Sequence, residues 1–444
     1  MTPAIQIQTE NRPQPAPVPD EPLLAAEEDG ILVLSRAEAE ARSLNLTRIF
    51  KKMTPFPENM SIPRLLLSLD LGAQCWHAAL LSAKRTGRHA FKGMEKPEQL
   101  LAAVRREMLR LGIRETRDVV ACHEIGRDGL WVRDWLVAHG IACVVFSPDV
   151  LSGNSKTVKT DKVDAARLAV RLSRFFGGEL ECDHVHLPPS AECQEGRALS
   201  RERQFAVAER TRHGSRFLSI LARHKEVPPR LDIRKVDVDA LRDQLGEPLP
   251  PGEVEALRMA RRRYLAADAD AENVRRKMAK ALAGEAKKEK ARAKAGGEAA
   301  PASPPGLLAM ALKLTRLNGI GLRTAWVLVH ELFHKEFRNT GQVSSATGLV
   351  AVPRSSGTAN RCGGVSKRSN GPLRGACVEA AWLWLRHQPG SAISRWFDGR
   401  TAQGVSARRM RKVAIVAVAR KLAVALWKYL ALDIMPEGAV RTGA

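Results

Sequence analysis

The sequence predicts an α/β domain with a mixed sheet, then long charged helices, then a mostly α-helical C-terminal domain. Three observations support this order. Short apolar runs alternate with helical patterns over residues 64–178, an Ala-, Arg-, Lys- and Glu-rich stretch spans residues 195–300, and helix-period apolar residues follow residue 305. At 444 residues the chain is too long for one hydrophobic core, so we expect two or three domains.

The net charge points to a polyanionic partner. The 71 Lys and Arg residues against 48 Asp and Glu give a net charge of +23, and nucleic acid is the usual partner of such a chain. Six Lys or Arg and no acid occur between Glu336 and Glu379, and eight and no acid between Asp398 and Asp433. We therefore expect the phosphate-binding surface in the C-terminal third.

The lack of a recognisable targeting signal and the cysteine usage favour a cytoplasmic, nucleoid-associated protein with no membrane partner. No run of 18 uncharged apolar residues occurs, and residues 1–20 do not resemble a signal peptide. The seven cysteines lack CxxC spacing, which favours reduced thiols. Residues 1–60 are expected to be a partly disordered N-terminal extension with one helix, Arg36 to Ile49.

The domain over residues 61–180 is predicted from its strand pattern. Three strands in meander come first, and strands alternate with helices after them: strands Leu65–Leu71, Ala78–Ser82 and Arg88–Phe91, helix Pro97–Leu111, strand Asp118–His123, helix Gly129–His139, strand Ile141–Phe146 and helix Lys162–Phe175. This order fits a mixed sheet of the ribonuclease H type. A flavodoxin-like or Rossmann sheet is the competitor, but no glycine-rich turn follows the first strand, which argues against dinucleotide binding.

Four carboxylates are expected at one edge of this sheet. Asp70 and Glu124 end two of the strands, and Asp161 and Asp164 open the last helix. Residues three apart share a helix face, although helix capping explains Asp161 and Asp164 equally well when they are taken alone. Converging carboxylates repel one another unless a divalent cation neutralises them, and their oxygens suit Mg²⁺ or Mn²⁺. Two such ions are the standard arrangement for breaking phosphodiesters.

Residues 195–300 form a charged helical region and a linker. The pattern predicts a helix from Arg197 to Lys225, ended by Pro228 and Pro229. A second helix, Val254 to Lys294, has the composition of a solvent-bridging helix or coiled coil.

The domain over residues 305–435 contains a second candidate chemical site. Ser355 and Ser356 precede Gly357 in a stretch without acids. Ser-Ser-Gly alone indicates a turn, and serine needs a base or a metal to become a nucleophile. Nearby cations could approach a DNA phosphate and stabilise an oxyanion: Arg354, Arg361, Lys367, Arg368 and Arg374. A second basic group opens the predicted helix 405–432 and could contact a nucleic-acid backbone: Arg408, Arg409, Arg411 and Lys412.

A turn in the same domain has two interpretations. Gly319-Ile-Gly321 precedes a predicted helix, Leu322–Leu332, and could bind a phosphate through its backbone amides. It could equally be a tight turn between two packed helices.

These blocks resemble the DEDD insertion-sequence transposases related to the pilin-gene invertases, the family of serine recombinases guided by a bridge RNA. The matching acids are Asp70, Glu124, Asp161 and Asp164, the last two within the run Lys159-Thr-Asp-Lys-Val-Asp-Ala. The C-terminal blocks match in the same order: Leu314–Gly321, Ala346–Gly357, Val365–Arg374 and Val413–Leu422. The resemblance covers roughly residues 64–180 and 305–432. The chain departs from the family pattern at His123 and Ile125, beside Glu124, and at Ser369.

The resemblance implies a RuvC-like domain whose four acids bind Mg²⁺ or Mn²⁺. It also implies a serine in the C-terminal transposase domain, Ser356 in preference to Ser355, that forms a covalent link to DNA. Further implied are a homo-oligomer (dimer or tetramer) paired through the middle helices, double-stranded DNA as substrate, and a structured guide RNA. The predicted activity is that of a DNA transposase or site-specific recombinase that mobilises an insertion sequence.

Two alternatives remain open from the sequence. A metal-dependent structure-specific DNA nuclease would cut with water, and Ser355 and Ser356 would then be only a turn. A non-catalytic nucleic-acid-binding protein, derived from a decayed element, would bind without reacting.

Overall fold

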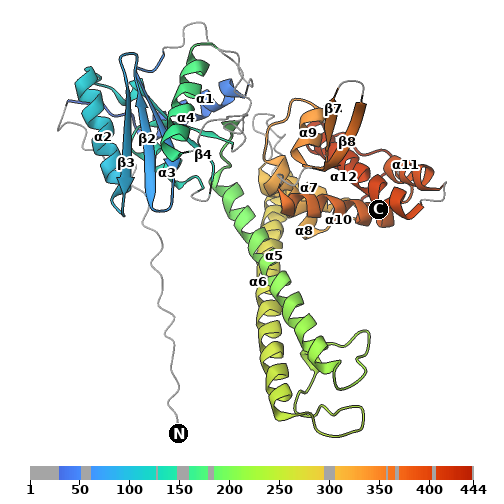
Figure 1. Ribbon diagram of the computed structural model, residues 1–444. Helices are drawn as coiled ribbons and strands as arrows, with labels where there is room; N and C mark the ends of the chain where they lie inside the picture. Colours follow the sequence, from blue (N-terminus) through green and yellow to red (C-terminus); the bar gives the residue numbers. More distant parts are fainter. Residues whose placement is uncertain are drawn as a thin grey trace. The chain divides into compact units, whose positions relative to one another are not determined.

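The computed structural model describes residues 30–51, 62–126, 129–147, 160–178, 185–294, 306–356, 359–365, 370–402 and 407–442. The chain divides after Pro188 into two compact units. Figure 1 labels the helices and strands. Within the described residues, none of the helices combines the length and the apolar character that a membrane span requires.

The first unit contains a six-stranded mixed sheet. Its strands are β1 (Leu65–Leu71), β2 (Cys75–Leu81), β3 (Thr86–Lys92), β4 (Val119–Glu124), β5 (Ala142–Phe146) and β6 (Val185–His186), in the order β3-β2-β1-β4-β5-β6. The first three strands are antiparallel, and β1, β4 and β5 run parallel. The predicted mixed sheet that begins with a meander is confirmed. The sequence missed β6, because a two-residue strand leaves no periodic pattern.

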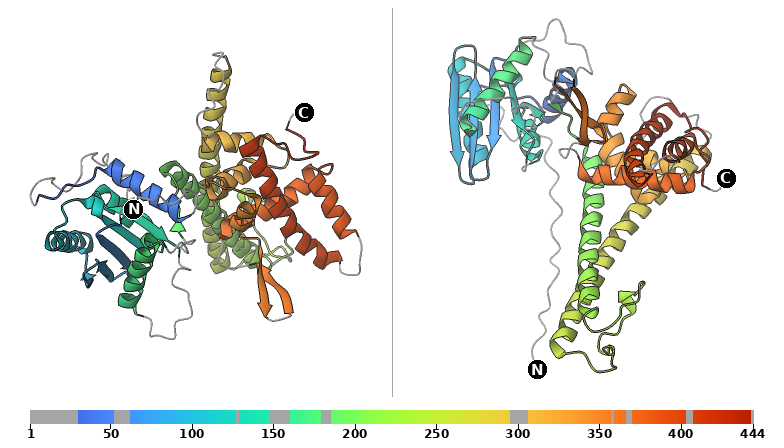
Figure 2. Two further views of the ribbon diagram at one scale, coloured as in Figure 1. Left: turned by 90° about the horizontal axis from the view of Figure 1, so that it is seen from above. Right: turned by 45° about the vertical axis from the view of Figure 1, so that its right-hand side comes forward.

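Helices cover both faces of this sheet (Figures 1 and 2). They are α1 (Arg36–Phe50), α2 (Lys96–Leu111), α3 (Trp131–Ala138) and α4 (Asp161–Phe176). Leu65, Leu67 and Leu69 share a core with α2 and α3, whereas Leu66 packs with α1 and α4. Because side chains alternate along a strand, the even-numbered residues of β1 face α4.

The predicted helix of the N-terminal extension is α1, and its start has a physical cause. The Ser35 side chain and Glu38 form a capping box at its first turn. Leu46, Ile49 and Phe50 are buried against the sheet, so α1 is part of the first unit's core.

The second unit begins with two long helices that pack along each other, α5 (Ala191–Leu221) and α6 (Pro251–Lys294), which we call the arm (Figure 1). The predicted helix to Lys225 is wrong at its end: α5 stops at Leu221. Leu221 and Phe217 there join a small core with Ile233 and Leu249, and this packing turns the chain before the two prolines.

The rest of the second unit is largely helical. It consists of α7 (Leu307–Thr315), α8 (Leu322–Leu328), a π-helical turn (Val329–Phe333), α9 (Thr340–Ala346), α10 (Gly371–His387), α11 (Ala392–Thr401), α12 (Ala407–Leu432) and the hairpin β7 (Ala351–Ser356) and β8 (Ala359–Val365). Trp384, Tyr429 and Leu332 are among the residues of its hydrophobic core. The expected mostly helical C-terminal part is confirmed.

Candidate functional site

Two of the predicted acids lie at the carboxyl ends of adjacent parallel strands, Asp70 as the second-last residue of β1 and Glu124 as the last residue of β4. Leu69 of β1 pairs with His123 of β4, so Asp70 and Glu124 are the next residues on neighbouring strands. The face of the sheet that α4 covers carries Leu66 and Ser68 of β1 and Val120 and Cys122 of β4. By strand alternation, Asp70 and Glu124 therefore lie on the α4 face, at the carboxyl ends of their strands.

The other two acids lie in the first turn of α4. The Ser68 hydroxyl donates to the Ala165 carbonyl at 2.6 Å, which fixes this turn against β1. Asp161 is exposed, with 66% of its side chain accessible, whereas Asp164 is buried with its Oδ1 3.4 Å from Arg167 Nη1. Thr160, at the N-cap, makes no side-chain capping bond. A capping hydrogen bond from the Thr160 side chain is therefore absent from this acidic turn.

His77 is a residue of this corner that the sequence did not reveal. It stands directly opposite Asp70 in the β1–β2 ladder, and its Nδ1 lies 3.9 Å from Asp161 Oδ2. That distance is too long for a hydrogen bond, and the buried Nδ1 has no hydrogen-bond partner. Its Nε2 is 3.9 Å from Cys75 Sγ. The hairpin register was the one signal that could have found His77.

The donor chemistry of this corner fits a divalent metal. Carboxylate oxygens are the ligands that Mg²⁺ and Mn²⁺ favour, and the unpartnered Nδ1 of His77 marks a buried polar position without its complement. Among the described residues, however, no three His, Cys, Asp or Glu side chains form a group that could hold a metal ion. The acids share one corner of the sheet without sharing one coordination sphere.

The two serines lie at the end of a strand. Ser355 and Ser356 are the last residues of β7 and pair with Asn360 and Ala359 of β8, and Arg354 pairs with Arg361. The side chains of residues 352–362 lie outside the described part of the structure, as do Gly357, Lys367 and Arg368 altogether. The backbone alone therefore places both serines near the tip of the hairpin.

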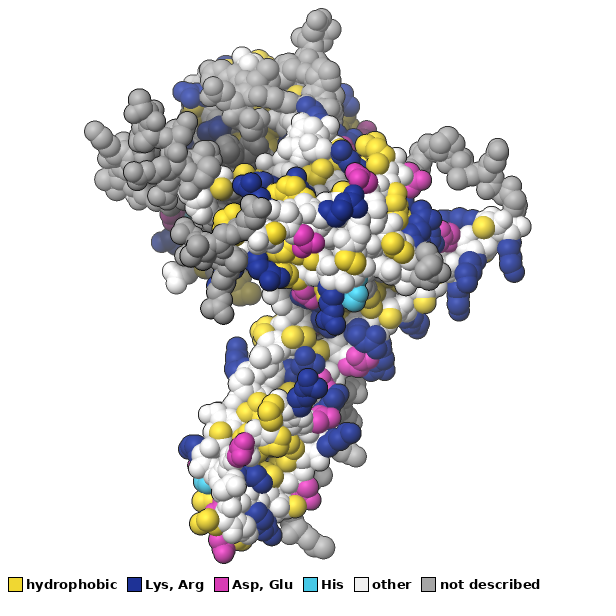
Figure 3. All heavy atoms as spheres, turned by 90° about the vertical axis from the view of Figure 1, so that its right-hand side faces the viewer, with side chains coloured by type: hydrophobic (Ala, Val, Ile, Leu, Met, Phe, Trp, Pro, Cys, Tyr) yellow, Lys and Arg dark blue, Asp and Glu magenta, His cyan; other side chains and the backbone are white. Residues whose placement is uncertain are grey.

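The remaining predicted basic residues are spread over two helices. Arg374 lies in the first turn of α10, and Arg411 and Lys412 are exposed on α12. The side chains of Arg408 and Arg409 are outside the described residues. Figure 3 shows Lys and Arg side chains over both the arm and the helical part of this face, with Asp and Glu among them.

The Gly319-Ile-Gly321 turn is used inside the fold. Gly319 has φ +85, and a Cβ there would lie 3.0 Å from the Leu383 carbonyl. The amide of Asn318 donates to the Val440 carbonyl and that of Ile320 to Leu317. These contacts favour the tight-turn interpretation over phosphate binding.

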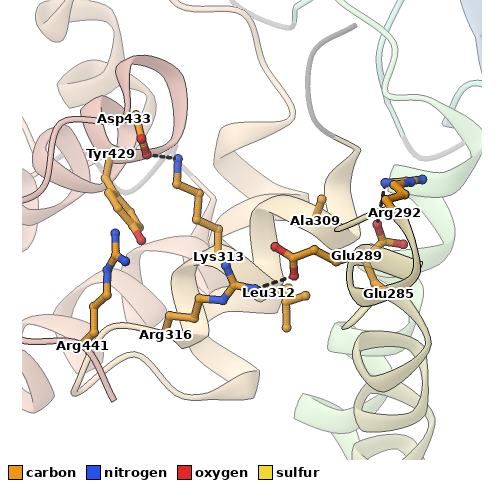
Figure 4. A pocket seen from close by; sticks show the side chains of 10 residues that line it. All are labelled: Glu285, Glu289, Arg292, Ala309, Leu312, Lys313, Arg316, Tyr429, Asp433 and Arg441. Atoms are coloured by element: carbon orange, nitrogen blue, oxygen red, sulfur yellow. Dashed lines mark hydrogen bonds and ion pairs between the residues drawn. The ribbon is translucent and has the colours of Figure 1, made fainter. Parts of the chain in front are cut away.

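A polar pocket of about 420 Å³ lies between α6, α7 and the end of α12 (Figure 4). Its cations face acids: Lys313 Nζ is 2.6 Å from Asp433 Oδ1, and Arg316 pairs with Glu289. The hydrogen bond from Lys313 lowers the pKa of Asp433. These ion pairs connect α7 to the C-terminal segment on one side and to the arm on the other. Because the charges neutralise one another, the pocket is a poor site for a phosphate.

Comparisons with known proteins agree on one family. The family model described as "Transposase IS116/IS110/IS902 family" matches residues 311–395, which include the β7–β8 hairpin. A curated protein of Sinorhizobium fredii (strain NBRC 101917 / NGR234), named "Putative transposase y4rJ", is 32% identical over 405 residues. The match covers 87% of this chain and 96% of that protein.

Proposed function

Because the chain belongs to the IS116/IS110/IS902 family of transposases, we propose that it breaks and rejoins DNA with two chemical groups. One is the carboxylate corner of the first unit, and the other is a serine of the β7–β8 hairpin. The family assignment makes the protein a DNA-binding enzyme that mobilises an insertion sequence.

The first unit supports a ribonuclease H-like, RuvC-like catalytic domain over residues 61–180. Its antiparallel β3-β2-β1 meander continues into parallel β4 and β5, and α4 covers the face on which Asp70 and Glu124 lie. The observation that carries the proposal is that these two acids lie at the carboxyl ends of adjacent strands, beside the first turn of α4. In this scheme residues 1–60 extend that domain, residues 195–300 form the arm and linker, and residues 305–435 form the transposase domain.

Asp70, Glu124, Asp161 and Asp164 would hold Mg²⁺ or Mn²⁺, a kind of cofactor that transposases typically use. When bound, such ions lower the pKa of a coordinated oxygen and neutralise charge on the phosphate. The chain itself supplies two fixed acids on the strands, a buried acid on α4, and the exposed Asp161, whose first-turn position leaves it free of packing. His77, opposite Asp70 in the β1–β2 ladder and 3.9 Å from Asp161 through its Nδ1, would orient the carboxylates of this corner.

The serine step is a transfer of a phosphoryl group to Ser356 or Ser355. The serine Oγ forms a bond to phosphorus as the bond from phosphorus to the leaving sugar oxygen breaks. The serine proton passes to solvent, and the leaving sugar oxygen takes up one proton from solvent to become a hydroxyl group. Arg354 and Arg361 pair in the backbone register of the hairpin, and cations of this kind would stabilise the charge that develops on the phosphate. Rejoining is the reverse reaction with a different sugar hydroxyl.

The partners follow from charge and shape. The net charge of +23 suits double-stranded DNA and a structured guide RNA, whose backbones the protein would contact while base pairing selects the site. The arm is an elongated helical surface suited to pairing with a second copy, which supports a dimer or tetramer.

A denaturation-resistant protein–DNA adduct tests the proposal. Purified protein is incubated with RNA transcribed from the flanks of its element, Mg²⁺, and end-labelled donor and target DNA. The adduct should form with wild type and with Ser345→Ala, an exposed control on α9. It should be absent with the double variant Ser355→Ala/Ser356→Ala and with Asp70→Ala. Equal DNA cutting by wild type and the double serine variant, with no adduct, would establish the hydrolytic nuclease instead.

A further inference from the structure

A buried carboxylate in the second unit belongs to neither site described above. Glu331 lies in the π-helical turn that continues α8, and only 1% of its side chain is exposed. Such π-turns occur frequently at functional sites. Burying a carboxylate is costly unless cations and hydrogen-bond donors surround it. The partners of Glu331 therefore show what this turn holds together.

Two arginines of the arm neutralise this carboxylate. Arg197 Nε lies 3.0 Å from Glu331 Oε2, and the Arg197 side chain is 15% exposed. This contact is an ion pair without hydrogen-bond alignment, because Arg197 Nε has no hydrogen-bond partner. Arg201 Nε donates to Glu331 Oε1 at 3.2 Å. The turn and the first part of α5 are thus tied by charge.

Hydrogen bonds from side chains to backbone carbonyls hold the same two elements close together. Trp326 Nε1 donates to the Gly196 carbonyl at 2.8 Å, and the Cys193 thiol donates to the His330 carbonyl at 3.1 Å. The His330 ring occupies the space where a side chain at residue 196 would stand. The position of α5 against the turn is therefore closely defined.

The same carboxylate also binds the N-cap residue of α10, the helix that follows the serine hairpin in the sequence. Asn370 Nδ2 donates to Glu331 Oε2 at 2.8 Å. Asn370 Oδ1 accepts from the Leu373 amide at 3.1 Å, as the N-cap of α10. Asn370 precedes α10 directly, and it is five positions after Val365, the last residue of β8. One carboxylate thus joins the arm to the start of α10, the helix that follows the hairpin in the sequence.

We propose that Glu331 is a positioning residue for the β7–β8 hairpin. By binding Arg197 and Arg201 on one side and Asn370 on the other, it fixes the start of α10 relative to the arm, and the hairpin that precedes α10 in the sequence is positioned through it. The inference rests on the proposed role of Ser355 and Ser356. Placement matters because a displacement of about 1 Å from the reactive geometry can slow a reaction about 10²-fold.

A reciprocal exchange tests this positioning role. Glu331→Gln removes the charge, and Asn370→Asp keeps a good N-cap but sets two carboxylates against each other. The combined exchange restores one amide facing one carboxylate and keeps the net charge. Each single variant should slow adduct formation at saturating DNA by about tenfold or more. The DNA concentration that gives half the maximal rate should change by less than about threefold. The combined variant should recover most of the rate.

The matched control is Glu379→Gln, which makes the same chemical change at an exposed acid of α10 paired with Arg323. It should keep the wild-type rate. Arg201→Gln is the milder variant, since 56% of the Arg201 side chain is exposed. Arg201→Gln should fold and, like Glu331→Gln, slow adduct formation. It therefore tests the positioning role even if Glu331→Gln does not fold.

Hydrogen–deuterium exchange of the free protein separates this inference from the serine chemistry. Peptides covering β8 and the start of α10 should exchange faster in Glu331→Gln and in Arg201→Gln than in wild type. In Glu379→Gln the exchange rate of these peptides should equal that of wild type. Unchanged exchange there in both variants would overturn the positioning role. If wild type forms no serine adduct, the proposed function fails, while the exchange comparison still decides whether Glu331 holds the hairpin.

Discussion

Replacement of Gly196 by alanine should destabilise the second unit, although alanine is the better helix former. Gly196 lies inside α5, and a Cβ at this position would lie 1.9 Å from His330 Cδ2 and 2.2 Å from Nε2. The ring cannot retreat easily. It is 1% exposed, stacks on Trp326 with centroids 4.7 Å apart, and is hydrogen-bonded through Nδ1 to the Trp326 carbonyl.

The expected magnitude combines three contributions. Alanine gains about 1 kcal/mol over glycine in a helix interior. Overpacking costs about 1–3 kcal/mol, and displacing the Trp326 Nε1 hydrogen bond to the Gly196 carbonyl costs about 1–3 kcal/mol more. The net loss is about 3 kcal/mol in the free energy of unfolding. For a unit of this size, each kcal/mol shifts Tm by about 2–4 °C, so Tm should fall by about 6–12 °C.

Thermal unfolding followed by circular dichroism checks this against Gly284→Ala. Gly284 lies inside α6, and a Cβ there meets no atom within 4 Å. The control should gain about 0.5–1 kcal/mol, because only the backbone entropy of glycine is removed. Opposite signs for the two substitutions are the expected result. If Gly196→Ala were as stable as Gly284→Ala, the close contact of α5 with the π-helical turn would be refuted.

Two further predictions concern pH and salt. Burial lowers the pKa of His330 below its usual 6.5, so the unfolded chain binds a proton at this histidine more readily than the folded protein does. The contribution of His330 to the free energy of unfolding should therefore be constant above about pH 7.5 and fall as the pH drops through 6.5. The loss of Tm between pH 7.5 and 5.5 should be smaller in His330→Phe, and an identical loss in both proteins would count against the burial effect. Lys412→Gln should weaken DNA binding about equally for all sequences and reduce the slope of log affinity against log salt by about 1; an unchanged slope would remove Lys412 from the DNA surface.

The sheet could be predicted because its information is local. Five of the seven residues of β1 are leucine, and Gly72 follows them before the next strand begins. The order of three strands followed by alternating helices then limits the topology to a few candidates. Strand ends also predict where Asp70 and Glu124 lie, since parallel neighbours end at the same edge.

Other parts of the candidate sites depend on partners far away in the chain. Glu331 looks like any helical acid until Arg197, Arg201 and Asn370 are brought to it, 130 residues upstream in the case of Arg201. His77 becomes informative only through its register opposite Asp70. No local pattern encodes such pairings, so sequence reasoning could not find them.

The most direct measurement is the identity of the residue that becomes linked to DNA. The adduct formed with donor DNA would be digested with nuclease and protease, and the nucleotide-bearing peptide sequenced by mass spectrometry. We expect one modified peptide, with the nucleotide on Ser356 or Ser355. A nucleotide on any other residue, or cut DNA without a modified peptide, would contradict it.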